Sequence, residues 1–322
     1  MKFQFDGTDK KIEEKEYDVI ILGAGPAGIT AGIYTGRALL KTLIVEEKMI
    51  GGEAASTDRI ENYPGFPEGI SGLELMDNMK KQAEKFKTQF LMSTVHNVAV
   101  SEEKKTVIAD QGEFSARTLI VATGSSPKSL GIPGEQKFKG RGISYCATCD
   151  APFFKDKDIA VIGAGNSGIQ ESLFLLEYVR SIKIIEFLPH MTAEKILQER
   201  IKQKNNVTFY LNSKLRSING SQTVESVTIE KRETGEKTEL PVDGVFVWVG
   251  LKPNTELFKG MLNLDDYGFI LTDEFLKTNI DGIFAAGDVR KKILRQVATS
   301  VGDGALSAYS ALQYIESLHS ES

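Results

Sequence analysis

The chain has 322 residues, of which 41% are hydrophobic and 26% are charged, and its formal net charge is −5. This length predicts two domains, and the lack of a basic tract argues against a nucleic-acid-binding protein. The apolar runs, such as VFVWVG at 245–250, are too short to cross a bilayer, and residues 1–18 contain no apolar stretch of signal-peptide length. Two cysteines in so long a chain suit a reducing compartment, so we expect a cytoplasmic protein with no membrane partner.

The first patterned segment, YDVIILGAGPAG at 17–28, is an apolar run that leads into the motif G-x-G-x-x-G. A helix-compatible stretch and a second apolar run, KTLIVEE, follow in the order of a βαβ unit. In such a unit the first glycine makes a tight turn, the second lets the backbone approach a pyrophosphate, and the third lets helix and strand pack closely. An acid at the end of the second strand accepts hydrogen bonds from ribose hydroxyls. The residues in these positions are Gly23, Gly25, Gly28 and Glu46.

The only two cysteines of the chain, Cys146 and Cys149, lie in the segment SYCATCDAPFF at 144–154. The spacing C-x-x-C lets both sulfurs bond within one turn, and a helix N-terminus or a nearby charge can lower the pKa of one thiol. A zinc site would need two more ligands, and the three histidines, at positions 96, 190 and 319, have no paired spacing. A purely structural pair is the other alternative. The pattern favours a redox pair and no metal.

A second copy of the glycine pattern, KDIAVIGAGNSG at 157–168, lies 140 residues after the first. It too is followed by a helix-compatible segment and by an apolar strand that ends at an acid. One such motif is a weak indication, because glycine-rich turns are common. Two motifs in the same register favour two Rossmann-type nucleotide-binding modules over structural turns with surface acids. The residues of the second module are Gly163, Gly165, Gly168 and Glu186.

Two further segments predict strands that end in tight turns, TLIVATGSSP at 118–127 and GIFAAGDV at 282–289. Such strand ends fit a flavoprotein that holds two nucleotides. Asp288, just past the second strand, is placed to meet the ribityl or phosphate part of a flavin nucleotide. Taken alone, each segment is simply a strand end.

From about residue 16 to 315 the chain resembles the low-molecular-weight thioredoxin reductases, which are FAD flavoproteins with a C-x-x-C redox pair. The matching segments are GAGPAG, GGEAASTDRIENYPGFP (51–67), VATGSSP, IPGE (132–135), GISYCATCDAPFF, VGLKPNT (249–255) and GIFAAGDVRKKILRQVATSVGDGA (282–305). The resemblance implies an α/β fold with two Rossmann-like modules. It places an FAD-binding domain at 1–125 and 252–322, with an inserted NAD(P)-binding-like domain at 126–251 that carries the cysteines. It also implies a homodimer.

The resemblance assigns residues to the FAD site. The ADP half would be held by the first glycine motif and its acid, and the flavin half by residues from three other segments. Glu53 stands where the family more often has glutamine, so its contact with FAD is not carried over. The cofactor-binding residues implied are Gly23, Gly25, Gly28, Glu46, Gly51, Gly52, Asn62, Gly124, Asp288, Arg295 and Gln296.

The resemblance also implies roles for the residues of the C-x-x-C segment. Cys149 would lie nearer the flavin, and Cys146 would exchange with the disulfide of a substrate, most simply thioredoxin. Asp150 occupies the position of the family acid that protonates the leaving thiolate. On the sequence alone, Asp150 is equally a turn residue.

The segment EFLPHMT at 186–192 departs from the family pattern. Relatives that use NADPH have H-R-R-x-x-x-R here, and their arginines bind the 2′-phosphate through charge-assisted contacts. In this chain Glu186 replaces the histidine, and Phe187, Leu188 and Thr192 replace the arginines. NADPH is therefore disfavoured. Three readings of the donor stay open: NADH, whose plain ribose Glu186 would bind; reduced ferredoxin, as in members of the family that do not use pyridine nucleotides; and weak residual use of NADPH.

Two rival functions share this scaffold. A ferredoxin–NAD(P) reductase is the first, although those relatives lack the C-x-x-C pair. A non-enzymatic flavin-bound redox sensor, whose disulfide only reports redox state, is the second. Turnover of a thioredoxin disulfide separates both from the function that we expect.

Overall fold

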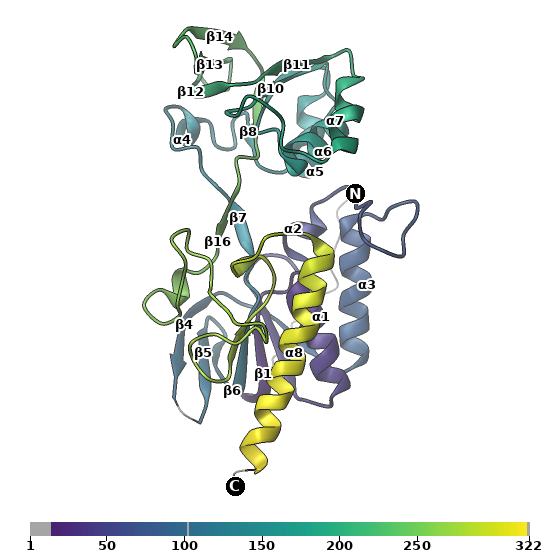
Figure 1. The fold of residues 1–322 in the computed structure, drawn as a ribbon, viewed down its shortest axis with the longest axis vertical. Helices are drawn as coiled ribbons and strands as arrows, with labels where there is room; N and C mark the ends of the chain where they lie inside the picture. The colour runs from purple at the N-terminus through teal and green to yellow at the C-terminus, as the bar shows by residue number, and fades with distance from the viewer. Residues whose placement is uncertain (1–13, 102, 321–322) are drawn as a thin grey trace. The chain divides into compact units, whose positions relative to one another are not determined.

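The computed structural model describes residues 14–101 and 103–320, so most of the polar N-terminal segment lies outside the described residues. The chain divides into two compact units. Unit 1 comprises Met1–Ser125 and Pro253–Ser322, and unit 2 comprises Ser126–Lys252. Each unit has its own sheets, drawn in Figure 1, and its own hydrophobic clusters.

Unit 1 is built on a seven-stranded sheet in the order β3-β2-β1-β6-β5-β4, with β17 also paired to β6. β3, β2, β1 and β6 are parallel neighbours, whereas β6, β5 and β4 form an antiparallel meander. β17 pairs in parallel with residues 119–121 at the end of β6, so it extends the parallel part of the sheet. The strands are β1 (Glu16–Leu22), β2 (Thr42–Glu46), β3 (Gln89–Met92), β4 (Val95–Val100), β5 (Lys105–Ala109), β6 (Gly112–Val121) and β17 (Ile283–Ala285).

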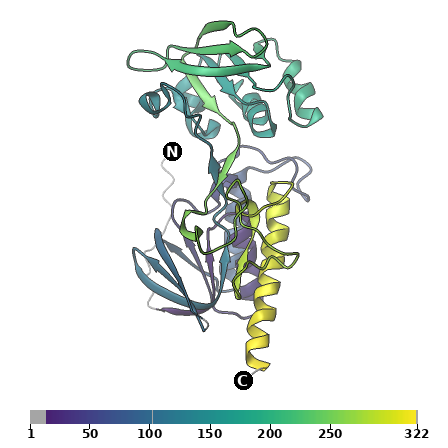
Figure 2. The ribbon, with the colours of Figure 1, turned by 60° about the vertical axis from the view of Figure 1, so that its left-hand side comes forward.

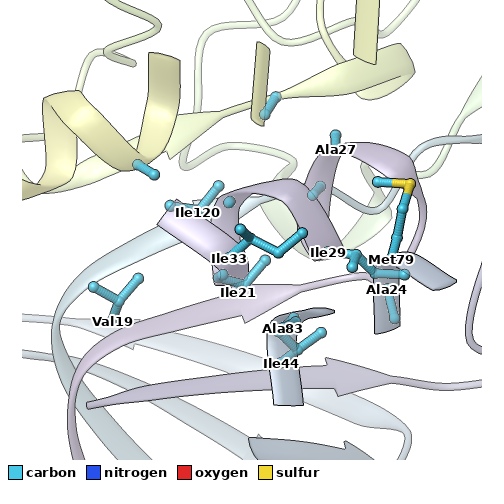
Figure 3. Packing of buried hydrophobic residues seen from close by; sticks show 14 of the residues in the cluster. Val19, Ile21, Ala24, Ala27, Ile29, Ile33, Ile44, Met79, Ala83 and Ile120 are labelled. Atoms are coloured by element: carbon cyan, nitrogen blue, oxygen red, sulfur yellow. The ribbon is translucent and has the colours of Figure 1, made fainter. Parts of the chain in front are cut away.

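Three helices cover one face of this sheet: α1 (Pro26–Arg37), α3 (Gly72–Lys85) and α8 (Val297–Ser320). α1 packs against both α3 and α8, which run beside it in Figure 1, and Figure 2 shows α8 in yellow from another side. Alternate residues of β1 enter different cores, because successive side chains of a strand point to opposite faces. Val19 and Ile21 lie in the core under the helices, shown in Figure 3, whereas Ile20 and Leu22 lie in the core on the other face. The short helical elements of unit 1 are α2 (Gly52–Ala55), η2 (Glu256–Phe258) and η3 (Gly287–Val289).

The chain passes between the units twice, and the two crossings pair with each other. β7 (Ser125–Pro127) and β16 (Leu251–Pro253) form a two-stranded sheet. Backbone hydrogen bonds extend the pairing at both ends, from Lys128 N to Gly250 O at 2.9 Å and from Asn254 N to Gly124 O at 3.0 Å.

Unit 2 has a five-stranded sheet in the order β11-β10-β9-β15-β8, in which every neighbouring pair is parallel. A three-stranded antiparallel sheet, β12-β13-β14, packs over one face of it. The strands are β8 (Ile143–Ser144), β9 (Asp158–Ile162), β10 (Ser181–Ile185), β11 (Val207–Tyr210), β12 (Ser213–Asn219), β13 (Ser226–Lys231), β14 (Lys237–Pro241) and β15 (Gly244–Val247). The helical elements are α4 (Glu135–Phe138), α5 (Ala147–Asp150), η1 (Ala151–Phe154), α6 (Asn166–Leu175) and α7 (Lys195–Lys202).

The predicted α/β fold with two Rossmann-like modules is confirmed. β1-α1-β2 in unit 1 and β9-α6-β10 in unit 2 are both parallel βαβ units with a glycine turn between the first strand and the helix. Within 14–101 and 103–320, none of the helices combines the length and the apolar character that crossing a membrane requires.

Candidate active site and nucleotide sites

The first glycine turn joins β1 to α1, and its three glycines do different things. Gly23 has φ +104°, and a Cβ on it would lie 2.3 Å from the carbonyl oxygen of Ala122. A Cβ on Gly28 would lie 1.9 Å from the carbonyl oxygen of Gly23, so only glycine lets the helix pack here. A Cβ on Gly25 would meet no atom within 4 Å. The fold therefore needs the outer two glycines, whereas the middle one leaves open space for a ligand.

Glu46, at the end of β2, is held beside this turn by two backbone amides. Its Oε2 accepts a hydrogen bond from Ala24 N at 2.8 Å, and its Oε1 accepts one from Lys48 N at 2.9 Å. Each carboxylate oxygen has a second lone pair for a further donor. The arrangement suits the two hydroxyls of an adenosine ribose.

The segment that begins at Gly51 packs directly on the same turn. Gly51 N donates to Ala24 O at 2.7 Å, and a Cβ on Gly52 would lie 3.4 Å from Gly25 Cα. Both glycines have positive φ, +107° and +56°. The structure thus brings the two predicted glycine segments together.

Other predicted flavin-side residues also meet within unit 1. Asn62 Nδ2 donates to Gln296 Oε1 at 3.1 Å, which joins two segments that are 234 positions apart. Gly124, with φ +64°, lies at the tight turn after β6 and has open space at its Cα. Near Gly51, burial raises the pKa of the Glu53 carboxyl, with Lys48 opposing the rise.

Asp288 lies in η3, which directly follows β17, and Arg295 lies two residues before α8. Burial raises the pKa of the Asp288 carboxyl, and the charges of Lys292 and Arg295 oppose that rise. Lys292 Nζ lies 3.5 Å from Asp288 Oδ1 and 3.1 Å from Asp303 Oδ2, a contact that the sequence analysis missed although its i,i+4 spacing from Asp288 was a signal. The Arg295 guanidinium lies 4.0 Å over the Phe269 ring, and its buried Nε has no hydrogen-bond partner in the described part of the chain. An open glycine, a fixed carboxylate and an unpaired buried donor together fit FAD.

The two cysteines of unit 2 are joined in a disulfide, with their Cα atoms 5.4 Å apart. Cys146 is half-buried at the N-terminal end of α5, and Cys149 is exposed. Ser144 Oγ accepts from Cys146 N at 3.1 Å and donates to Cys146 O at 3.0 Å, so it holds the Cys146 backbone. Cys149 N points at Cys146 Sγ over 3.3 Å. A backbone donor in that place stabilises a thiolate.

Asp150 is the last residue of α5 and directly follows Cys149. Its side chain makes no capping hydrogen bond to the adjoining η1 helix, so the role of a turn-capping residue is not seen. Within the residues that the structure describes, no three His, Cys, Asp or Glu side chains are grouped as a metal site requires.

The second glycine turn, between β9 and α6, repeats the contacts of the first. A Cβ on Gly163 would lie 2.1 Å from Trp248 O, and one on Gly168 would lie 2.1 Å from Gly163 O. Gly165 is open, with only Thr192 Oγ1 near its Cβ position, at 3.5 Å. Glu186 Oε2 accepts from Ala164 N at 2.6 Å, and Oε1 accepts from Leu188 N at 2.9 Å.

The segment after Glu186 contains an arginine contact that the sequence analysis missed. The Phe187 side chain is 48% exposed, and the Arg232 guanidinium lies 3.9 Å over its ring. Arg232 Nη1 also donates to Phe187 O and to Asn212 Oδ1, each at 3.2 Å. Arg232 is 45 positions from Phe187 and is placed beside it by the antiparallel pairing of β12 with β13, which residues 186–192 alone do not indicate.

Comparisons with known proteins agree with this geometry. Residues 17–304 match the family described as pyridine nucleotide-disulphide oxidoreductase. The chain is 41% identical to the thioredoxin reductase of Peptoclostridium litorale over 96% of this chain and 100% of that one. It matches the crystal structure of Lactococcus lactis thioredoxin reductase with a TM-score of 0.92 and 39% identity, covering 94% of this chain and 99% of that chain. A ferredoxin-flavin thioredoxin reductase from Clostridium acetobutylicum matches with a TM-score of 0.51 and 28% identity, over 95% and 99% of the two chains.

The chain belongs to the pyridine nucleotide-disulphide oxidoreductases and, within them, to the low-molecular-weight thioredoxin reductases. It is therefore an enzyme of the flavoprotein disulfide oxidoreductase class, as predicted. Membership of this family implies FAD and a nicotinamide cofactor, and the Cys146–Cys149 disulfide is present.

Proposed function

We propose that the chain is an FAD-dependent thioredoxin-disulfide reductase whose electron donor is not NADPH. The observation that carries the reductase activity is the disulfide itself, whereas the exclusion of NADPH rests on the missing arginines of residues 186–192. The disulfide is accessible at Cys149, and the Cys149 N–H points at Cys146 Sγ. A ferredoxin–NAD(P) reductase does not need this cysteine pair. A redox sensor does not need an N–H group that stabilises one of its thiolates.

The residues of unit 1 would hold FAD as the sequence analysis expected. The first glycine turn and Glu46 would take the ADP half, and Gly51, Gly52, Asn62, Gly124, Asp288, Arg295 and Gln296 the flavin half. When bound, FAD supplies the electron pair that opens the Cys146–Cys149 disulfide.

The chemistry of the reduced pair follows from its own contacts. The Cys146 thiolate, stabilised by the Cys149 N–H, attacks one sulfur of the thioredoxin disulfide and forms a mixed disulfide. The other thioredoxin sulfur leaves as a thiolate and takes a proton from Asp150. Cys149 then attacks Cys146, the Cys146–Cys149 disulfide closes again, and thioredoxin leaves with both sulfurs reduced. The two electrons lost by the cysteine pair equal those gained by thioredoxin.

The donor that we favour is NADH, because Glu186 repeats the geometry of Glu46. Both carboxylates accept one amide from the glycine turn and one from two residues further on. A carboxylate in this place binds the plain ribose of NADH and repels the 2′-phosphate of NADPH. Reduced ferredoxin is the second candidate, on the basis of the similarity to the ferredoxin-flavin enzyme of Clostridium acetobutylicum.

The donor is tested by mixing the oxidised protein anaerobically with NADPH, NADH or reduced ferredoxin and following flavin bleaching. We expect NADH to bleach the flavin at micromolar concentrations and NADPH to fail. Fast bleaching by NADPH would refute the proposal, and bleaching by ferredoxin alone would replace NADH with the second candidate. A thioredoxin turnover assay with the same donor tests the reductase activity. A homodimer, also proposed, is tested by light scattering.

A further inference from the structure

Glu135 is a buried carboxylate that is hydrogen-bonded to the side chain of the residue preceding Cys146, and the mechanism above does not use it. It begins α4 and is 2% exposed, and among the described residues its hydrogen-bond donors are two backbone amides and two hydroxyls, none of which is a cation. Burial raises the pKa of the Glu135 carboxyl, but hydrogen bonds outweigh that effect and the pKa is lowered from its ordinary value. Glu135 is therefore ionised at neutral pH and is fully occupied as an acceptor.

The four donors to Glu135 are divided evenly between its two oxygens. Oε1 accepts from Leu130 N and from the hydroxyl of Tyr145, both at 2.7 Å. Oε2 accepts from the hydroxyl of Ser129 at 2.7 Å and from Gly131 N at 2.8 Å. Three donors belong to residues 129–131, where the chain has just entered unit 2 from β7. The fourth belongs to the residue that directly precedes Cys146.

Tyr145 links this carboxylate to the redox turn. Its ring packs against the core between the two sheets of unit 2, and Glu135 raises the pKa of its hydroxyl in addition to the effect of burial, so the hydroxyl stays a donor. Ser144, on the N-terminal side, already holds the Cys146 backbone. In the oxidised protein the disulfide also fixes Cys146 Sγ near Cys149 N. Once the disulfide is reduced, the Cys146 backbone is held from its N-terminal side by the pairing of β8 with β15, by Ser144 and by Tyr145, and Tyr145 is the anchor that connects it to Glu135. Thr148 Oγ1 also lies 3.5 Å from Cys146 Sγ.

We propose that Glu135 is a positioning residue that acts through Tyr145 and keeps the reduced Cys146 sulfur in line with the Cys149 N–H. The inference rests on the proposed function in that Cys146 is taken as the attacking thiol. It predicts that loss of the Tyr145 hydroxyl destabilises the Cys146 thiolate relative to the thiol, whereas the oxidised protein keeps its fold.

Direct substitution of Glu135 is a poor test. An amide in Glu135→Gln would turn its NH₂ group toward two donors, whichever way it is oriented, so this variant is at risk of not folding. Tyr145→Phe and Ser129→Ala avoid the problem. Each removes one hydroxyl donor, at the same 2.7 Å, from the same carboxylate. Only Tyr145→Phe removes the connection to Cys146.

The experiment uses the full-length holoprotein in the Cys149→Ser background, in which Cys146 is the only thiol of the chain. Its thiolate displaces iodide from iodoacetamide, and the rate is measured across pH. We expect Tyr145→Phe to move the pH profile up by about one unit, which slows alkylation about tenfold at pH values below the midpoint of the profile. Ser129→Ala should leave the profile unchanged. Melting temperatures of the oxidised single variants confirm that both fold.

Equal profiles for Tyr145→Phe and Ser129→Ala, or an unchanged profile for Tyr145→Phe, would overturn the inference. The readout does not involve thioredoxin or a donor. Failure of the unmodified protein to reduce thioredoxin would therefore refute the proposed function separately. The reciprocal Cys146→Ser background reports on Cys149, and a Tyr145→Phe effect of the same size there would also overturn the inference, because general loosening of the turn would explain it.

Discussion

The two glycine turns of the molecule make the same internal contacts but have different surroundings. In each, the outer glycines abut backbone oxygens, the middle glycine is open and a glutamate accepts two backbone amides. At the first turn, Gly52 packs on Gly25. Elsewhere in unit 1, the buried Nε of Arg295 has no hydrogen-bond partner among the described residues. Beside the second turn, the Arg232 guanidinium is stacked on the Phe187 ring and donates a hydrogen bond to Phe187 O. The motif therefore specifies the shape of the turn, and we propose that residues outside it select which nucleotide each turn binds.

The largest expected effect distinguishes the two middle glycines. Gly25 and Gly165 have φ −78° and −82°, which any residue adopts, and a Cβ on either fits the protein. Valine at each position should thus leave the fold intact and obstruct only the ligand. We expect Gly25→Val to be purified colourless, and Gly165→Val to stay yellow but lose reduction by NADH. Absorbance and anaerobic bleaching measure both.

Each glycine variant is the control for the other, because the two turns are equivalent in backbone geometry. A yellow Gly25→Val protein would show that FAD does not lie on the first turn. If Gly165→Val kept its full activity with the physiological donor, the second turn would not be the entry point for electrons, and ferredoxin would be favoured.

Substitution of the cysteines separates reduction of the flavin from reduction of thioredoxin, and both glycine turns stay intact. Cys146→Ser and Cys149→Ser should each abolish thioredoxin reduction, because no dithiol remains to close a disulfide. Flavin bleaching by the donor should continue in both variants. Measurable thioredoxin turnover by both single variants would mean that the pair is not the relay.

Asp150 should affect only the transfer of electrons from the cysteine pair to thioredoxin. Asp150→Asn removes a proton donor but keeps the shape of the side chain, so we expect thioredoxin turnover to fall about 100-fold. Flavin bleaching in the same sample is the internal control and should not change. Near-normal turnover would make Asp150 a turn residue without a part in the exchange.

The parts of the structure that the sequence predicts best are those with a local cause. A short continuous apolar run predicts β1, and the glycine motif predicts the turn that follows it. The end of α1 is less predictable, because the apolar pattern continues to Leu40 while the helix stops at Arg37 and Leu39 takes φ +62°. Helix boundaries depend on tertiary packing as well as on local pattern.

Contacts between distant segments could not be predicted in the same way. Residues 186–192 contain no arginine and therefore argue against a phosphate site. They give no sign of Arg232, which a β-hairpin brings to Phe187. IPGE served only as a matching segment, although its Glu135 binds Tyr145 beside the disulfide. Both contacts depend on how strands of unit 2 are placed, which no local period records.

A smaller effect is expected when the two equivalent glutamates are replaced. Glu186→Ala removes the ribose acceptor of the second module, and hydrogen bonds to a charged group of this kind contribute ~1.5–3 kcal/mol. The NADH concentration for half-maximal bleaching should therefore rise about tenfold or more, with FAD content unchanged. Glu46→Ala should instead weaken FAD retention. Should Glu186→Ala leave NADH kinetics unaltered, the similarity between the two carboxylates would have no functional meaning.

The smallest effect should come from Arg232, and it decides whether this arginine substitutes for those missing after β10. Its guanidinium is stacked on Phe187 and donates to Phe187 O and Asn212 Oδ1, so we expect it to support the segment after Glu186 and not to bind a 2′-phosphate. Losing an exposed contact of this kind costs ~0.5–1 kcal/mol, so Arg232→Ala should weaken the binding of NADH about threefold. Arg216→Ala, which breaks the pair with Glu230 in the same sheet, is the matched control and should have no effect on NADH. Loss of residual NADPH binding in Arg232→Ala, with NADH spared, would instead assign this arginine to the phosphate.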